Sequence, residues 1–131
     1  MTRSKIRECI FCILFRSDFH KKEEMAEQCR LYLNDIENVS EEDYNYISNK
    51  VNNIVNSIDK IDDVLNQVSV GWKTTRMAKS DLTVLRLAYY EMKNETDIPD
   101  KVAVNEAVNL AKKYGTDNSQ AFVNGILAKL I

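Results

Sequence analysis

The sequence predicts a compact, all-helical fold. Its 131 residues include only three glycines and one proline, whereas a β-sandwich or barrel needs turn residues about every 8–12 positions. Hydrophobic residues make up 44% and charged residues 29%, a composition typical of a domain with a buried core and not of a disordered chain. Apolar residues recur at steps of three and four along most of the chain, which is the period of a helix. We therefore expect one all-α domain over residues 1–131.

Two helices are predicted in the first part of the chain. Segment 4–17 has a broad apolar face, so we expect it to be covered on more than one side. The residues of that face are Ile6, Ile10, Ile13 and Leu14, widened by Phe11 and Phe15. Segment 22–36 carries a second helical stripe, formed by Met25, Cys29, Tyr32, Leu33 and Ile36.

Segment 40–69 has the clearest helical pattern. Ser40 followed by Asp43 resembles a capping box, and Val39 with Tyr44 has the spacing of a hydrophobic staple. The apolar stripe then follows the first and fourth positions of a heptad. Its members are Tyr44, Ile47, Val51, Ile54, Ile58, Ile61, Leu65 and Val68. The pattern predicts either one long helix or two helices with a bend near Ser57.

The last part of the chain predicts a short helical turn over 73–78 and three further helices. Segment 80–94 begins at Ser80, a plausible N-cap, and the stretch 94–100 contains Pro99 and is expected to be a loop. Segment 101–114 is followed by Gly115, a favourable residue after a helix end. Segment 118–131 completes the fold, and its buried face is predicted to be Phe122, Ile126, Leu127 and Leu130.

Charge is distributed unevenly along the chain. The net charge is −2, but residues 1–22 hold six cations and two anions, whereas residues 34–63 hold eight anions and two cations. A basic terminal segment on an acidic protein favours local attraction for phosphate.

The sequence offers little support for an enzyme, a metal site or a cofactor site. Cys9-x-x-Cys12 lies in an apolar run without a second such pair, and the only histidine is His20. The three cysteines lack a disulfide framework, which favours reduced thiols and a cytoplasmic location. The apolar run from Cys9 to Phe15 is seven residues long, whereas a membrane-spanning helix needs about 20.

Three groups of residues are candidate contacts. Arg3 and Arg7 share one stripe of the first helix, with Lys5 on another face, and guanidinium groups suit RNA phosphates and bases. The alternative is that these cations only promote solubility.

The second candidate is the run from Phe122 to Gly125. A glycine inside a helix costs about 1 kcal/mol relative to alanine, which suggests the close approach of a helix or ligand. Phe122 and Asn124 point to different faces, and core packing and an internal hydrogen bond are the respective alternatives.

The third candidate is segment 81–91. Arg86 and Tyr90 share a stripe beside the buried face, and Asp81 lies at its N-terminal end. This polar stripe is a candidate partner surface. Alternatively, Asp81 is a favourable first-turn anion and Arg86 forms an internal salt bridge.

Coupled motifs in the C-terminal half resemble the NusB family of bacterial transcription antitermination factors. They are Trp72-Lys73-x-x-Arg76-Met77, Asp81-x-x-Val84-Leu85-Arg86-Leu87-Ala88-Tyr89-Tyr90-Glu91, Ile98-Pro99-x-Lys101-Val102-Ala103-Val104-Asn105-Glu106-Ala107-Val108, Leu110-Ala111-Lys112-Lys113-Tyr114-Gly115 and Phe122-Val123-Asn124-Gly125. The N-terminal residues also agree with the family's arginine-bearing first helix, though less specifically, through Arg3-x-x-x-Arg7-Glu8 and Leu14-Phe15. The resemblance implies about seven helices in two packed bundles. It also implies binding to boxA RNA together with the ribosomal protein NusE, in a complex with other Nus factors and RNA polymerase that suppresses premature termination and supports ribosomal RNA synthesis.

The resemblance also assigns residues. Arg3, Lys5, Arg7, Phe122 and Asn124 correspond to the family's RNA-binding surface, and Asp81, Arg86 and Tyr90 to the region that faces NusE. We interpret Asn105-Glu106 as a structural pair that ties helices together. Three positions, Ser4, Leu82 and Asp100, depart from residues frequent in the family, and the last two are expected to change the surface near the partner site.

One other function remains open from the sequence. The heptad stripe over 44–68 could support a helical homodimer that acts as a protein-interaction module without specific RNA binding. NusB-like modules also occur fused to RNA methyltransferases, but no methyl-donor-binding segment is present here, so methyltransferase activity is not expected.

Overall fold

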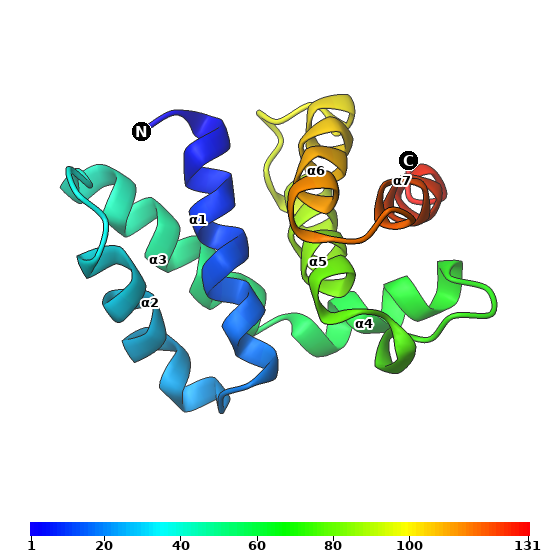
Figure 1. The fold of residues 1–131 in the computed structure, drawn as a ribbon, viewed down its shortest axis with the longest axis horizontal. Helices are drawn as coiled ribbons and strands as arrows, with labels where there is room; N and C mark the ends of the chain where they lie inside the picture. The colour runs from blue at the N-terminus through cyan, green and yellow to red at the C-terminus, as the bar shows by residue number, and fades with distance from the viewer. The chain divides into compact units, whose positions relative to one another are not determined.

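The computed structural model describes all 131 residues and contains seven α-helices and no strands (Figure 1). Residues 1–57 and 58–131 form two compact units. The first unit holds α1 (Arg3–Phe15), α2 (Met25–Asn34) and α3 (Glu41–Val55). The second holds α4 (Ile58–Val68), α5 (Lys79–Asn94), α6 (Asp100–Tyr114) and α7 (Ser119–Ala128). The predicted all-α class and helix number are confirmed.

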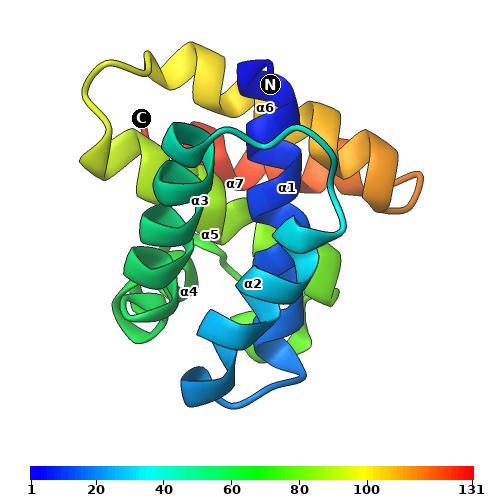
Figure 2. The same cartoon turned by 90° about the vertical axis from the view of Figure 1, so that its left-hand side faces the viewer.

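In the first unit, α1 and α2 both pack against α3 (Figure 2). The Thr2 side chain caps α1 by accepting a hydrogen bond from the Lys5 backbone N–H at 3.1 Å. The predicted apolar faces meet in this unit, where Ile10, Ile13 and Ile47 are fully buried. Most polar residues of the same helices are exposed, but Arg7 of α1 and Lys50 of α3 are buried.

The heptad segment 40–69 is divided into two helices, which confirms the second of the two alternatives predicted from the sequence. Ser40 caps α3 by accepting from the Asp43 N–H at 3.0 Å. The helix ends at Val55, and α4 begins at Ile58. Asn56 and Ser57 separate the two helices, and both are weak helix formers that compete for backbone hydrogen bonds. The central members of the stripe are buried within the protein: Ile47, Val51, Ile54, Ile61 and Leu65. The stripe therefore offers no exposed apolar face to a second copy.

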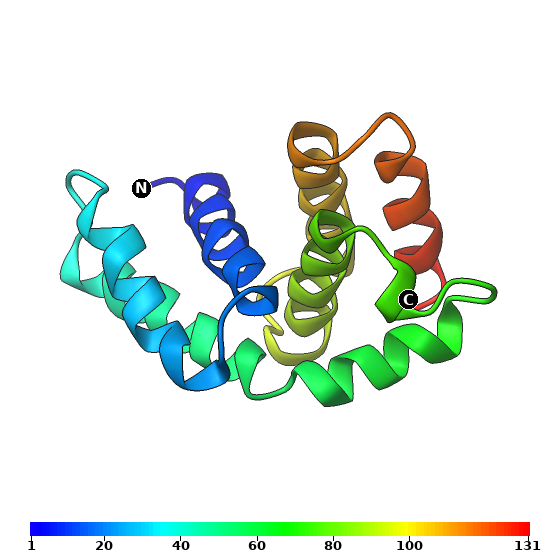
Figure 3. The same cartoon turned by 60° about the horizontal axis from the view of Figure 1, so that its bottom comes forward.

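In the second unit, α5 packs against α4, α6 and α7 (Figure 3). Eight consecutive residues of α5, from Asp81 to Ala88, are buried because neighbouring helices cover it on several sides. The turn between α6 and α7 is closed by Ser119, whose hydroxyl accepts a hydrogen bond from the Thr116 N–H at 2.9 Å. A Cβ atom at Gly115 would collide with the Ser119 side chain, so this tight turn requires glycine.

Several predicted helix ends need correction. Helix α5 begins at Lys79, with Ala78 at its N-cap, so Ser80 lies in the first turn and is not the cap. Residues 22–24 form a 3-10 turn that precedes α2. Gly115 ends α6 with an extended backbone (φ −98°) and not in the left-handed region. Helix α7 ends at Ala128, short of the predicted residue 131.

Candidate functional site

The three predicted RNA-contacting cations of α1 have different environments. Arg3 is exposed and makes no hydrogen bond or ion pair. The Lys5 ammonium pairs with the Glu8 carboxylate at 3.2 Å, and this hydrogen bond raises the pKa of Lys5. Arg7 is only 7% exposed. Solvent therefore reaches Arg3 and Lys5 on this helix, and Arg3 is the cation with no anionic partner.

Phe122 and Asn124 lie on different sides of α7, as their spacing predicts. Phe122 is half-buried and its ring meets the Trp72 ring edge-on, with centroids 6.5 Å apart. Asn124 is exposed and lines a separate hollow between α6 and α7. The two side chains therefore lie on two different surfaces of the second unit.

Asp81 lies in an open pocket of about 340 Å³, which we call the Asp81 pocket. Its walls are Trp72, Arg76, Met77, Ala78, Thr116, Asn118, Ser119 and Phe122. Asp81 is 8% exposed, and its buried Oδ1 atom has no hydrogen-bond partner. A buried carboxylate oxygen without a donor is costly, so the pocket suits a ligand that brings an N–H or a cation.

Arg86 is an internal brace of the second unit. Its Nε donates to Asp62 Oδ1 at 2.8 Å and its terminal nitrogen to Asp62 Oδ2 at 2.7 Å, a bidentate pair that joins α5 to α4. The arginine side chain is 8% exposed and the aspartate side chain 19%. The sequence predicts either a partner contact or an internal salt bridge for Arg86, and this ion pair is the internal salt bridge.

The three predicted partner residues therefore do not form one surface. Asp81 faces the pocket beside α7, Arg86 faces α4, and Tyr90 is half-buried farther along α5. Leu82 is 1% exposed, so its departure from the family pattern does not change the protein surface, contrary to our expectation. Asp100, the other departure, is exposed.

Two further expectations for the C-terminal helices need correction. Nothing lies within 4 Å of the position of a Cβ atom at Gly125, so no close helix approach explains this glycine. Asn105 is exposed and makes no hydrogen bond, so this member of the Asn105-Glu106 pair does not tie helices together, whereas Glu106 is half-buried and has an interaction within the protein. Asn105 lines the same hollow as Asn124.

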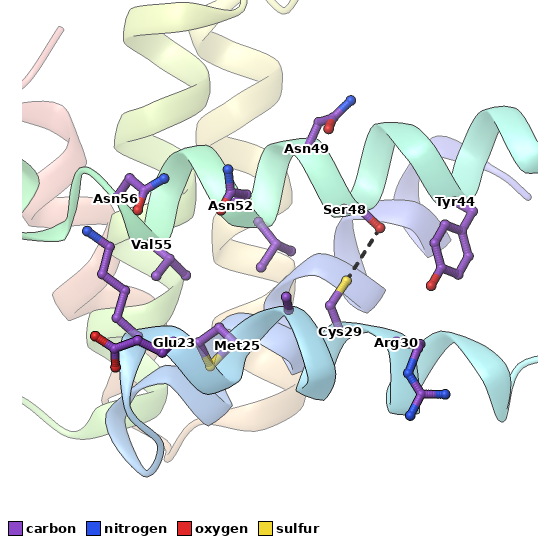
Figure 4. A pocket seen from close by; sticks show the side chains of 13 residues that line it. Glu23, Met25, Cys29, Arg30, Tyr44, Ser48, Asn49, Asn52, Val55 and Asn56 are labelled. Atoms are coloured by element: carbon purple, nitrogen blue, oxygen red, sulfur yellow. Dashed lines mark hydrogen bonds between the residues drawn. The ribbon is translucent and has the colours of Figure 1, made fainter.

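A hollow of about 710 Å³ lies between α2 and α3 (Figure 4). The Sγ atom of Cys29 and the Ser48 hydroxyl are hydrogen-bonded across it at 3.6 Å, and Asn49 points away from α2. Arg30 on its rim is already paired with Glu27. None of the predicted contact residues lines this hollow.

The three cysteines are all free thiols of the first unit. Burial raises the pKa of Cys9 and of Cys29, which keeps both as neutral thiols. No group of three or more histidine, cysteine, aspartate or glutamate side chains is placed to hold a metal ion. No helix combines the length and apolar character that a membrane crossing requires.

Residues 4–131 match the model of the NusB family. The chain belongs to this family. The "Transcription antitermination protein NusB" of Agathobacter rectalis is 54% identical over 129 residues, which cover 98% of each chain. The protein of the same name from Lachnoclostridium phytofermentans is 46% identical over 131 residues, which cover 100% of this chain and 99% of the relative.

Solved structures share the fold. NusB of T. maritima superposes with a TM-score of 0.91 at 33% identity and covers 99% of this chain and 90% of its own. A structure described as a plectonemic RNA supercoil contains a chain that superposes with a TM-score of 0.84 at 23% identity, covering 98% of this chain and 94% of its own. These likenesses confirm the NusB-like fold that the sequence motifs implied.

Sequence reasoning missed several residues around these sites. Asp62 was one of eight acidic residues in segment 34–63, and nothing local distinguishes it from Asp63. Trp72 belongs to one of the family motifs but is not among the three candidate contact groups, although it is 54% exposed and lines the Asp81 pocket. The four-residue spacing of Asn105 and Asn109 was a usable signal, because it places two amides on one helix face.

Proposed function

We propose that this protein is a non-catalytic RNA-binding factor that suppresses premature transcription termination by binding boxA RNA together with the ribosomal protein NusE. The observation that carries the proposal is the match to the NusB family over residues 4–131, with relatives named as antitermination proteins. In this proposal residues 1–131 act as one domain in the cytoplasm. The complex includes other Nus factors and RNA polymerase and supports ribosomal RNA synthesis.

The RNA contacts of α1 follow from its exposed cations. Arg3 has no anionic partner and is free to form bidentate contacts with a phosphate. Lys5 is partly neutralised by Glu8, and Arg7 is buried, so both contribute less than Arg3. On α7, the half-buried ring of Phe122 offers a stacking surface for a base. Asn124 offers an exposed amide that can hydrogen-bond to a base edge.

The protein partner is assigned to the Asp81 pocket. The unpartnered Oδ1 atom of Asp81 accepts a hydrogen bond from a cationic or amide side chain, and Trp72 supplies an exposed aromatic wall. Buried aromatic and charged groups of this kind carry much of the binding energy in protein interfaces. Arg86 and Tyr90 lie outside the pocket walls, and the Arg86–Asp62 ion pair joins α5 to α4.

The RNA part of the proposal is tested by measuring the affinity for boxA RNA and for a scrambled RNA, with and without NusE. We expect binding to boxA to tighten when NusE is present. The variant Arg3→Glu should weaken binding and lower its salt dependence, because one phosphate contact is lost. Lys60→Glu is the matched control, since Lys60 is an exposed, unpaired cation on α4. Equal affinity for boxA and scrambled RNA in the presence of NusE would refute specific recognition.

The partner part is tested with Asp81→Asn, which keeps the shape of the side chain and removes its charge. We expect weaker NusE binding with unchanged or slightly higher stability, because the Oδ1 atom has no internal partner to lose. Asp63→Asn, an exposed acid on α4, is the control. Unchanged NusE affinity in the Asp81 variant would remove the pocket from the interface.

A further inference from the structure

The hollow between α6 and α7 is lined mainly by side-chain amides. It measures about 590 Å³, and its walls are Asn105, Val108 and Asn109 from α6 and Gln120, Ala121 and Asn124 from α7. We call it the amide groove. The two helices pack against each other and are joined by a short turn (Figure 3). Each contributes two amides four residues apart, so the four groups form two facing rows.

All four amides are available to a ligand. None of them makes a hydrogen bond within the protein, and three are exposed while Gln120 is half-buried. Each carboxamide offers two N–H donors and one carbonyl acceptor. Val108 and Ala121 line the same groove and add apolar surface. The groove thus combines donors, acceptors and apolar surface, which a flat heterocycle with a polar edge requires.

The charges near the groove favour a nucleic acid over a protein. Lys101 precedes Asn105 by four residues and Lys112 follows Asn109 by three, so both extend the same row of α6. Both lysines are exposed and unpaired. The nearby anions are Asp100 at the start of α6, Asp117 in the turn before α7, and Glu106 beside Asn105, which is half-buried and already has an interaction within the protein. Unpaired cations at both ends of a neutral, hydrogen-bonding groove suit phosphates on either side of a bound base.

We propose that the amide groove binds an unpaired adenine of single-stranded RNA. Adenine presents an adjacent donor and acceptor on both of its polar edges, the 6-amino group with N7 and with N1, and each edge matches one carboxamide with two hydrogen bonds. Asn109 and Gln120, the members of the two rows that are nearer to the α6–α7 turn in the sequence, hold the base edge, and the two lysines contact the flanking phosphates. This proposal rests on the RNA-binding function above and extends the base contact assigned to Asn124 to a groove that is distinct from α1 and from the Asp81 pocket.

The test is a mutant cycle on boxA RNA in the presence of NusE. Its adenines are replaced one at a time by purine riboside, which lacks the 6-amino group. At one position, this replacement should weaken binding to the unaltered protein by about tenfold, the order expected for loss of a bidentate base contact. In the double variant Asn109→Ala/Gln120→Ala, the same replacement should have no further effect. The double variant Asn34→Ala/Asn45→Ala, which removes exposed amides of the first unit, should behave like the unaltered protein.

The possible results separate this inference from the proposed function. If every purine riboside replacement weakens RNA binding equally in the groove variant and in the unaltered protein, the groove does not read adenine. Weaker RNA binding by Arg3→Glu would still support the RNA-binding function in that case. If the groove variant loses NusE and not RNA, the groove belongs to a protein interface and the inference is wrong. If the unaltered protein binds no RNA, both the function and the inference are overturned.

Discussion

Removing the Asp62 carboxylate should destabilise the second unit, and the structure allows the effect to be estimated. The variant Asp62→Ala leaves Arg86 without the bidentate partner that it contacts at 2.7 and 2.8 Å. Breaking a buried pair in this way costs about 3–5 kcal/mol. Because the Asp62 side chain is 19% exposed and Arg86 has a further interaction, we expect a smaller loss than this range, about 2–3 kcal/mol.

The corresponding shift in Tm is large enough to measure by circular dichroism. A chain of 131 residues unfolds with an entropy of about 0.28 kcal/mol/K. A loss of about 3 kcal/mol therefore lowers Tm by about 10 °C. Asp62→Asn keeps a hydrogen-bond acceptor without the charge and should fall between the alanine variant and the unaltered protein.

The neighbouring residue supplies the control. Asp63 is exposed and has no partner, so Asp63→Ala should change the free energy of unfolding by no more than about 0.5 kcal/mol. Equal Tm values for Asp62→Ala and Asp63→Ala would show that the ion pair contributes nothing to stability, and the interpretation of Arg86 as a brace would be wrong.

Other substitutions and pH give further predictions. Gly125→Ala should raise the free energy of unfolding by about 0.5–1 kcal/mol in urea denaturation, because the helical site is open, whereas Gly71→Ala should lower it by about 1–2 kcal/mol, because φ is +85° there. A change of the same sign in the free energy of unfolding of both variants would contradict this reasoning. Burial raises the pKa of the Cys9 and Cys29 thiols, so at about pH 8 iodoacetamide should label them more slowly than the half-buried Cys12, as followed by mass spectrometry. Since the unfolded thiols ionise first, the free energy of unfolding should fall as pH rises above about 9.

The helical period was sufficient to predict the helices, but it did not predict how much of each helix is buried by its neighbours. In α6, the apolar residues at helical spacing are Val104, Ala107, Val108 and Ala111; the two alanines are buried, whereas the two valines are half-buried. The period identifies the apolar side of a helix, and the coverage depends on neighbours that are distant in the sequence. Helix α5 shows the limit most clearly, because eight consecutive residues are buried and no amphipathic pattern describes such a helix.

The candidate sites were predictable only in part, for a related reason. Spacing alone placed Phe122 and Asn124 on different faces of α7, and this is confirmed. The partner of Arg86 lies 24 residues earlier in the chain, and no local signal selects it from the other acids. Whether a charged residue is a surface contact or an internal brace depends on long-range packing, which a single sequence does not reveal.

The tight turn at Gly115 has a consequence for the two rows of amides on α6 and α7. Ser119 holds this turn closed through its bond to the Thr116 N–H, and no larger side chain fits at Gly115. The separation of the rows is thus set before a ligand arrives. A ligand that fits this spacing binds without a large loss of conformational entropy in the protein. A ligand of a different width binds less well, because the closed turn does not let the two helices move apart at this end.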